Sequence, residues 1–244
     1  AGNIAIVHGV SGTSRTFMGE EVAGADAARI ALARIAAGQS DIALIGGSHN
    51  GERKDLLVLY ECGDFNLKHE FAPVWMRQPK AGFALGSAGA FLVIESKAHA
   101  LARGAKPYAR LTNVVADLTQ RNRTGDVKAT LEKLWSKLGK LDGDGAIITG
   151  ATGVEPVTSE ERGFLAGHPD FPVRATGTRF GHTMETQFPL GIGLAALAIS
   201  RGALFPPGDS SGVEIEMSKP PAQIVVVGTG HWRGEGMALV EAIK

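Results

Sequence analysis

The chain has 244 residues, a formal net charge of +0 and a hydrophobic fraction of 44%, which is enough to bury a large core in one domain or two coupled ones. The neutral balance gives no electrostatic reason to expect nucleic acid or an anionic membrane as a partner, and no apolar run is long enough to span a bilayer. A single cysteine, Cys62, excludes an internal disulfide framework and indicates a reducing, cytoplasmic location.

The first fifty residues predict one strand–helix–strand unit. We expect a short apolar strand over residues 3–8 and a buried helix over residues 20–37, because small and aliphatic residues cover nearly every face of that helix. Gly38 ends the helix. Residues 41–45 form a short continuous apolar run, which is typical of a central parallel strand. A second helix is expected over residues 55–61.

A glycine-rich run follows over residues 82–95. Gly82, Gly86 and Gly89 let the backbone pass close to another backbone or to a ligand. Residues 91–94 then predict a buried strand, and residues 95–103 a short helix. Glycine before a strand is also an ordinary packing device, so this pattern alone does not assign a function.

The second half has the same alternation of elements. Lys106 and Pro107 mark the expected joint, which divides the chain into residues 1–105 and 106–244. Strands are expected over residues 108–118, 146–149, 173–176, 223–228 and 237–242, and helices over residues 126–138, 159–166 and 190–200. The composition and element order therefore predict an α/β protein.

The run over residues 82–110 closely resembles the glycine-rich strand and following helix of β-ketoacyl-acyl-carrier-protein synthases (ketosynthases). Residues 22–47 resemble the same family strongly, residues 181–207 moderately and residues 111–176 weakly. The resemblance implies a thiolase-like fold, layered α/β/α/β/α with mixed central sheets. It begins just upstream of the helix that carries the family's nucleophile, so we expect the N-terminal part of the first half to be missing.

The resemblance places Glu21 where ketosynthases have their cysteine nucleophile. A helix N-terminus stabilises a thiolate, but a carboxylate there is a poor acyl-thioester nucleophile because an anhydride is labile. The alternative is that Glu20 and Glu21 are ordinary acids of a first helical turn. Cys62 lies between acidic neighbours and is expected to be an inert, partly buried thiol rather than a substitute nucleophile.

The resemblance implies that this sequence retains only one of the family's two catalytic histidines. Ala151 stands where the first imidazole would be, and alanine can neither donate a hydrogen bond to a thioester enolate nor carry a proton. The pair Gly181–His182 matches the second histidine. A lone histidine near a helix start is more often structural, so His182 has either a chemical or a structural role.

Two further segments are candidates for substrate contact. Residues 228–236 resemble the family's glycine-rich gating loop, which makes Thr229, Gly230 and His231 candidate substrate-binding residues. His231 is either a displaced catalytic imidazole or a residue with a surface or packing role. Phe17 and Met18 are candidates for the floor of an acyl tunnel.

These observations favour a 3-oxoacyl-carrier-protein synthase-like subunit of fatty acid or polyketide-type chain elongation that does not condense by itself, similar to chain-length factors. Its expected partners are acyl carrier protein and a ketosynthase, in a homo- or heterodimer that pairs through the strand at residues 3–8. One alternative is a malonyl- or acyl-thioester decarboxylase or hydrolase that uses Glu21 and His182. Another is a non-catalytic scaffold that binds carrier protein. No cofactor is expected, since no phosphate loop, metal-ligand cluster or dinucleotide fingerprint is present in the sequence.

Overall fold

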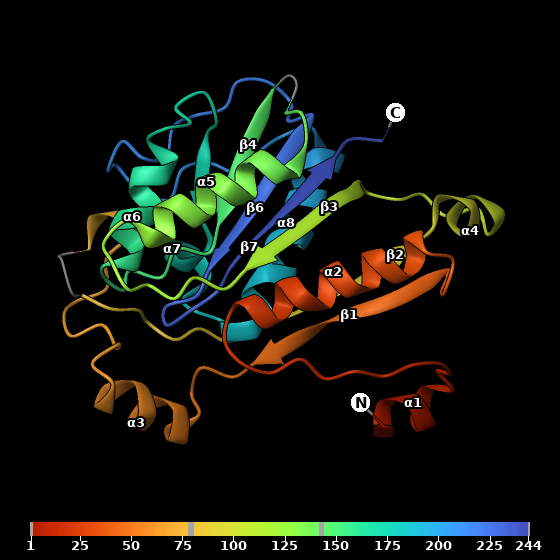
Figure 1. Ribbon diagram of the computed structural model, residues 1–244, viewed down its shortest axis with the longest axis horizontal. Helices are drawn as coiled ribbons and strands as arrows, with labels where there is room; N and C mark the ends of the chain where they lie inside the picture. Colours follow the sequence, from red (N-terminus) through yellow and green to blue (C-terminus); the bar gives the residue numbers. More distant parts are fainter. Residues whose placement is uncertain (1, 78–80, 142–143, 244) are drawn as a thin grey trace.

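A computed structural model describes residues 2–77, 81–141 and 144–243 (Figure 1). The elements of the first hundred residues are α1 (Gly2–His8), α2 (Val22–Ala36), β1 (Ile42–His49), α3 (Lys54–Cys62), the 3-10 helix η1 (Val74–Met76), β2 (Ala88–Glu95) and α4 (Lys97–Ala102). Those that follow are β3 (Arg110–Asp117), α5 (Asp126–Leu138), β4 (Gly145–Thr149), α6 (Val157–Leu165), β5 (Val173–Ala175), α7 (Thr176–Phe180), the 3-10 helix η2 (Met184–Thr186), α8 (Gln187–Arg201), β6 (Gln223–Thr229) and β7 (Glu235–Glu241).

The strands form two separate sheets. The larger one is mixed, with the order β3-β7-β6-β4-β5. In it β4 pairs in parallel with both β5 and β6, whereas β7 pairs antiparallel with β6 and β3. Every residue of β4 and of β6 is buried, which fits their apolar sequences and central positions. The smaller sheet consists of β1 and β2, paired antiparallel.

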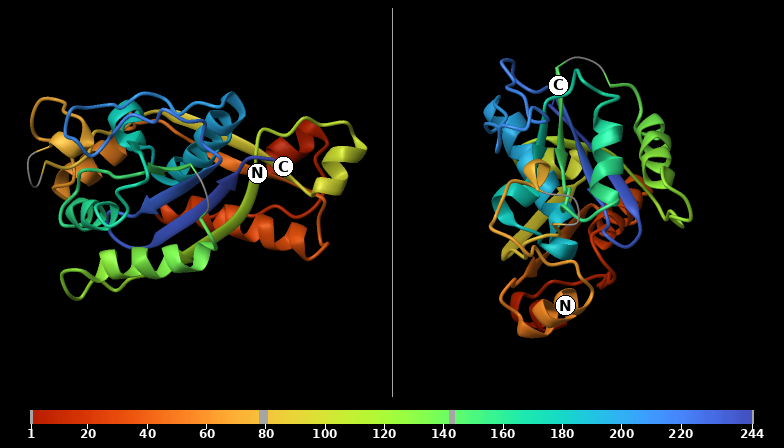
Figure 2. Two further views of the ribbon diagram at one scale, coloured as in Figure 1. Left: turned by 90° about the horizontal axis from the view of Figure 1, so that it is seen from above. Right: turned by 90° about the vertical axis from the view of Figure 1, so that its left-hand side faces the viewer.

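Helices α2 and α8 lie between the two sheets. Both contact strands of the large sheet as well as β1 and β2, and they also contact each other. Helices α5 and α6 pack together, and α5 covers the opposite face of the large sheet, as Figures 1 and 2 show. The layers are therefore helix, five-stranded sheet, paired helices and two-stranded sheet. This is the layered α/β fold expected from the sequence, except that no described helix covers the outer face of the two-stranded sheet, where Leu44 and Phe91 are exposed.

Small residues allow this close packing of the central helices. Ala25 and Ala28 of α2 are completely buried. A Cβ added at Gly24 would lie 2.6 Å from the carbonyl oxygen of Glu185, and one added at Gly191 would lie 2.7 Å from the Val226 side chain. Larger side chains at these positions would push α2 away from the start of α8, and α8 away from the large sheet.

The glycine-rich run lies against the segment that carries His182. The Gly86 N–H donates to the His182 carbonyl oxygen (3.0 Å), and the His182 N–H donates to that of Ala84 (2.7 Å). A Cβ at Gly86 would lie only 1.6 Å from the Phe180 carbonyl oxygen. The close backbone approach expected from the sequence is thus made to the loop that positions His182.

Three predictions for the first half are wrong. Residues 3–8 lie in helix α1 rather than in a strand, and no strand of the described residues pairs with them, so their backbone groups bond within the helix. The run at 41–45 belongs to an antiparallel strand of the two-stranded sheet, not to a central parallel one. Residues 91–94 are not fully buried: Phe91 and Val93 are 59% and 57% exposed, because no described element covers that face of β2.

In the described part of the chain, no helix combines the length and apolar character needed to cross a membrane.

Candidate active site

Three buried side chains from distant parts of the chain meet at one end of α2. Glu21 precedes the first turn of α2, His182 follows α7, and His231 lies in the loop between β6 and β7. The Oε1 atom of Glu21 lies 2.9 Å from Nε2 of His182 and 2.7 Å from Nδ1 of His231. All three side chains are at least 95% buried. One carboxylate oxygen is therefore shared by two imidazole rings.

The backbone also holds His231 on Glu21, since the His231 N–H donates to the same Oε1 atom (3.2 Å). Arg121 fixes the loop from outside: its guanidinium donates to the Gly230 carbonyl oxygen (2.6 Å) and to the carboxylate of Glu235 (3.0 Å). Gly230 is required because an added Cβ would lie 2.1 Å from the Arg233 carbonyl oxygen and 3.0 Å from Oε2 of Glu21. The conformation of the β6–β7 loop therefore places the His231 side chain against the Glu21 carboxylate.

Aromatic rings enclose the two histidines. The ring centroid of His231 lies 4.8 Å from that of Phe65 and 5.6 Å from that of Tyr60, both at steep angles. Phe83 lies 4.5 Å from His182. This apolar surround limits the water that can reach the cluster and strengthens each electrostatic contact within it.

The pKa values of the carboxyl groups follow from this environment. Burial raises the pKa of Glu21, but the hydrogen bonds and charges of His182 and His231 outweigh burial and hold it well below its usual range. The neighbouring Glu20 has a raised pKa, through burial first and then through the Glu21 charge. Burial and the same charge raise the pKa of Tyr60 to about 12. Glu21 is therefore the ionised group at the centre of the site.

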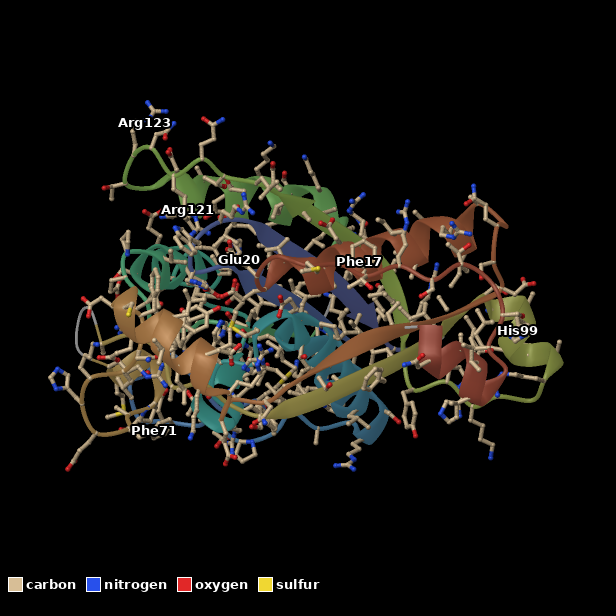
Figure 3. All side chains as sticks on the ribbon, turned by 90° about the horizontal axis from the view of Figure 1, so that it is seen from below. Phe17, Glu20, Phe71, His99, Arg121 and Arg123 are labelled. Atoms are coloured by element: carbon tan, nitrogen blue, oxygen red, sulfur yellow. The ribbon has the colours of Figure 1, made fainter. Side chains whose placement is uncertain are left out.

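A cavity of about 330 Å³ opens beside the cluster. It is lined by Glu20, Ser48, His49, Arg53, Leu56, Leu59, Tyr60, Met184, Glu185, His231 and Trp232. His231 is thus the cluster residue that faces the space in which a ligand fits. Phe17 and Met18 are not among the lining residues; Met18 is 85% exposed, and Phe17 lies in the segment that leads to Glu20 (Figure 3).

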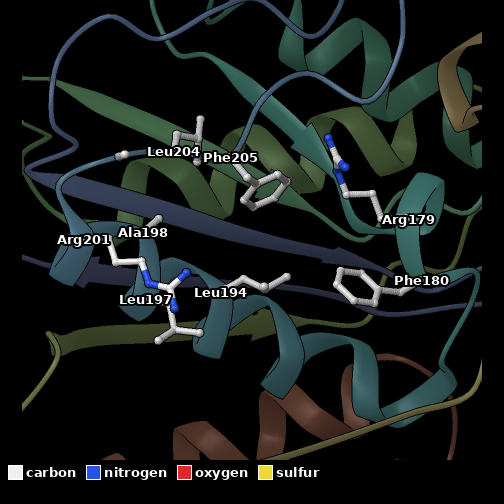
Figure 4. A pocket seen from close by; sticks show the side chains of 9 residues that line it. Arg179, Phe180, Leu194, Leu197, Ala198, Arg201, Leu204 and Phe205 are labelled. Carbon is white, nitrogen blue, oxygen red and sulfur yellow. The ribbon is translucent and has the colours of Figure 1, made fainter.

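A second cavity, of about 390 Å³, lies along the C-terminal part of α8 (Figure 4). Apolar side chains and two arginines, Arg179 and Arg201, line it. Arg179 also donates to the carbonyl oxygens of Pro206 and Pro207. None of the three cluster residues borders this cavity.

The other residues singled out in the sequence lie as follows. Ala151 is buried just after β4, and its N–H donates to the Thr149 hydroxyl (3.0 Å). Thr229 ends β6 and is buried at the base of the loop that carries His231. Cys62 ends α3 and is exposed, so the expectation of a partly buried thiol is wrong. It is not among the residues that line the cavity beside the cluster.

Sequence reasoning named Glu21, His182 and His231 separately but did not bring them together. It also missed Arg121 and Glu235, which hold the loop. Glu235 has a signal in the sequence: it is an acid directly before the uncharged run 236–240, and it is fully buried. Such a residue requires a charged or hydrogen-bonding partner.

No family model matches the chain, and neither does any of the curated proteins. Solved structures do match it. A type II PKS acyl-carrier protein in complex with its ketosynthase bound to the hexaketide gives a TM-score of 0.85 at 17% identity, and covers 100% of this chain and 66% of that one. The ishigamide ketosynthase/chain length factor gives 0.75 at 18% identity, with 91% of this chain and 59% of that one covered.

A β-ketoacyl synthase from Burkholderia phymatum also matches, with a TM-score of 0.82 at 17% identity over 100% of this chain and 65% of that one. The chain thus spans less than two thirds of the length of each of these three structures. At such low identity the likeness shows the fold alone. The chain has the thiolase-like α/β fold of the ketosynthases it matches.

Proposed function

We propose that this chain is a ketosynthase-like subunit of an acyl or polyketide-type chain-elongation system, and that it does not condense acyl groups by itself. One observation carries the proposal: a buried carboxylate, that of Glu21, stands between two imidazoles at the helix start where the resemblance expects a thiol. The low pKa of Glu21 keeps it as the unreactive anion. An acyl group on Glu21 would be a mixed anhydride, which is too labile to serve as an acyl-enzyme.

The only thiol in the chain does not restore the missing chemistry. Cys62 lies at the end of α3 and is exposed. A thiol that transfers an acyl group needs a base within hydrogen-bond reach and a site from which water is excluded. An exposed position at the end of α3 does not exclude water from the thiol.

The proposed partners are acyl carrier protein and an active ketosynthase. Two of the matched structures support this: one is a carrier protein in complex with its ketosynthase, and the other is a ketosynthase/chain length factor. In such a pair the partner performs the condensation and this chain shapes the space available to the growing acyl group. Because residues 3–8 are helical, strand pairing through this segment is not part of the proposal.

The experiment uses radiolabelled acyl- and malonyl-carrier protein with the purified chain, alone and with an active ketosynthase. Alone, the chain should give neither a labelled acyl-enzyme nor a condensation product. With the partner, it should co-purify and change the yield or length of the product. Cys62→Ser should behave as the wild type. Condensation by the chain without a partner would contradict the proposal.

A second candidate function is decarboxylation of a malonyl thioester, and the position of His231 favours it. The resemblance supplied only one catalytic imidazole, but His231 provides a second beside His182. In this reaction the bond between the α-carbon and the carboxylate breaks and carbon dioxide leaves. The electron pair of the broken bond stays with the thioester as an enolate, which imidazole N–H groups stabilise. The enolate then takes a proton from an imidazolium or from water.

This candidate is tested by carbon dioxide release from malonyl-carrier protein. His231→Ala should abolish the release, since it removes the imidazole that lines the cavity, and His182→Ala should lower it, since His182 is the second partner of the Glu21 carboxylate that holds His231. His99→Ala is the matched control, because His99 also contacts a glutamate (Glu95, 2.7 Å) but on the surface of α4. Release that survives both cluster substitutions would exclude this function.

A further inference from the structure

The cluster has the composition of a metal site that the sequence did not reveal. Glu21, His182 and His231 can each offer one ligand atom, and these atoms lie within 4.8 Å of one another. The donors come from positions 21, 182 and 231, and the packing of α2, the glycine-rich run and the β6–β7 loop holds them in place. The arrangement therefore does not need to be assembled by an ion.

Several polar atoms of the three cluster residues make no hydrogen bond within the described part of the chain. Oε2 of Glu21, Nδ1 of His182 and Nε2 of His231 are buried without a hydrogen-bond partner among the described residues, and Nε2 of His182 has only its ionic contact with Oε1 of Glu21 (2.9 Å). Unsatisfied buried polar atoms cost free energy, typically about 1–3 kcal/mol each. A cation that took lone pairs from this group would remove part of that cost.

Distances and ligand types both favour zinc or a similar divalent transition metal. Zinc binds imidazole nitrogen and carboxylate oxygen at about 2.0–2.2 Å, so tetrahedral ligands stand about 3.4 Å apart. The contacts of Oε1 at 2.7 and 2.9 Å lie within small side-chain movements of that spacing. Two nitrogens and one oxygen disfavour calcium and magnesium, which prefer oxygen ligands alone.

We propose that Glu21, His182 and His231 bind one zinc-class divalent cation, with its fourth coordination position directed to the cavity that His231 and Tyr60 line. Three protein ligands and one open position are the pattern of zinc sites that bind water or substrate. The charge balance agrees with this. Arg121 and Arg233 make their ion pairs with Glu235 and Glu20, and the ion pairs of Glu21 are with the two histidines.

The test measures zinc binding by the untagged full chain, in the absence of acyl substrates and partner proteins. After equilibration with zinc sulfate and gel filtration, the wild type should retain one zinc per chain by mass spectrometry of the metal. Glu21→Gln and His231→Gln should weaken binding at least about tenfold, the lower end of the loss seen when even outer-shell partners are removed. His99→Gln is the control, since the partly buried His99–Glu95 pair offers two donors rather than three.

If a variant fails to fold, cobalt(II) binding by the wild-type protein still tests whether the metal site exists. Cobalt(II) bound to wild-type protein by three protein ligands and water should give the intense visible absorption of a four-coordinate site, and zinc should displace it. Wild-type protein that retains no zinc and shows no such absorption overturns the proposal. So does zinc retention that is equal in the wild type and in folded Glu21→Gln. Because no acyl substrate is used, this result is independent of the condensation and decarboxylation assays.

Discussion

Replacing Gly86 with alanine tests whether the glycine-rich run positions His182. The added Cβ would lie 1.6 Å from the Phe180 carbonyl oxygen and 3.1 Å from the Gly181 Cα atom. Because both neighbours belong to the backbone, no side-chain rotation relieves the overlap. The two segments must separate by more than an ångström. That movement would break the hydrogen bonds that join Gly86 and Ala84 to His182.

The expected cost follows from these two effects. Overpacking a close-packed site costs about 1–3 kcal/mol, and each lost hydrogen bond adds about 1 kcal/mol. Two hydrogen bonds are lost, so we expect Gly86→Ala to lower the free energy of unfolding by about 3–5 kcal/mol, which corresponds to a fall of about 1–2 M in the urea midpoint. Urea unfolding followed by circular dichroism measures this difference.

Gly89 provides a matched control within the same run. A Cβ at Gly89 would lie 3.7 Å from Cβ of Ser48, which is an ordinary contact. Gly89 also lies in β2, where alanine is favoured over glycine by about 0.5–1 kcal/mol. Gly89→Ala should therefore unfold within about 1 kcal/mol of the wild type. Equal stability of the two variants would refute the argument that position 86 has no room for a Cβ atom.

Three further predictions concern the interior. Burial raises the pKa of Glu161 on α6 from 4.5 to about 7, so the folded state keeps a proton that the unfolded chain releases. The contribution of this group to the free energy of unfolding should therefore fall by about 3 kcal/mol as the pH rises from 4.5 through 7. In urea unfolding between about pH 5 and pH 8, Glu161→Gln should remove this dependence of stability on pH. Leu134→Ala leaves a cavity at a fully buried position of α5 and should lower the free energy of unfolding by about 2–5 kcal/mol, measured by thermal or urea unfolding. Leu101→Ala is the control: it changes a 64% exposed side chain and should lower the free energy of unfolding by less than about 0.5 kcal/mol. The Arg77 guanidinium donates to three backbone carbonyl oxygens, and Arg77→Met should lower the free energy of unfolding by about 2–4 kcal/mol; an unchanged urea midpoint would show that water replaces these bonds without cost.

Elements with a local signal could be predicted from the sequence. The helix expected over residues 126–138 is confirmed as α5, because Val127, Leu131, Leu134 and Leu138 repeat at helical spacing and all face the core. Glycines flank this helix on both sides, at positions 125 and 139. In such a segment the periodicity and the terminal residues agree, so the sequence alone is sufficient.

Elements without a local signal could not be predicted. Residues 3–8 are apolar enough for a strand, but a strand also needs a neighbour, and among the described residues none is present. The run at 41–45 is apolar on both faces, yet only one face of β1 meets α2 and α8: Leu44, on the other face, is 58% exposed. Pairing partners and covering layers are tertiary information that hydrophobic periodicity does not contain.

The site was partly predictable, for the same reason. The positions of Glu21 and His182 followed from resemblance, because each is attached to a recognisable helix or glycine pair. The contact with His231 depends on a loop whose shape is set by Arg121 and Glu235, which are more than one hundred residues apart in the sequence. No short motif encodes such a contact.

The departures from the ketosynthase pattern that the resemblance implies are physically linked. A carboxylate in place of a thiol brings a permanent negative charge into a buried site, and that charge needs donors. The resemblance places Ala151 where an imidazole is expected; in the structure His231 donates to Glu21 from the β6–β7 loop through its backbone N–H, and its ring contacts the same carboxylate. Removing His231 alone would leave the Glu21 charge with a single partner, whereas removing Glu21 alone would leave two unpaired imidazoles. We therefore expect that a substitution of Glu21 is tolerated best when His231 is changed with it, because each of the two side chains is the buried partner of the other.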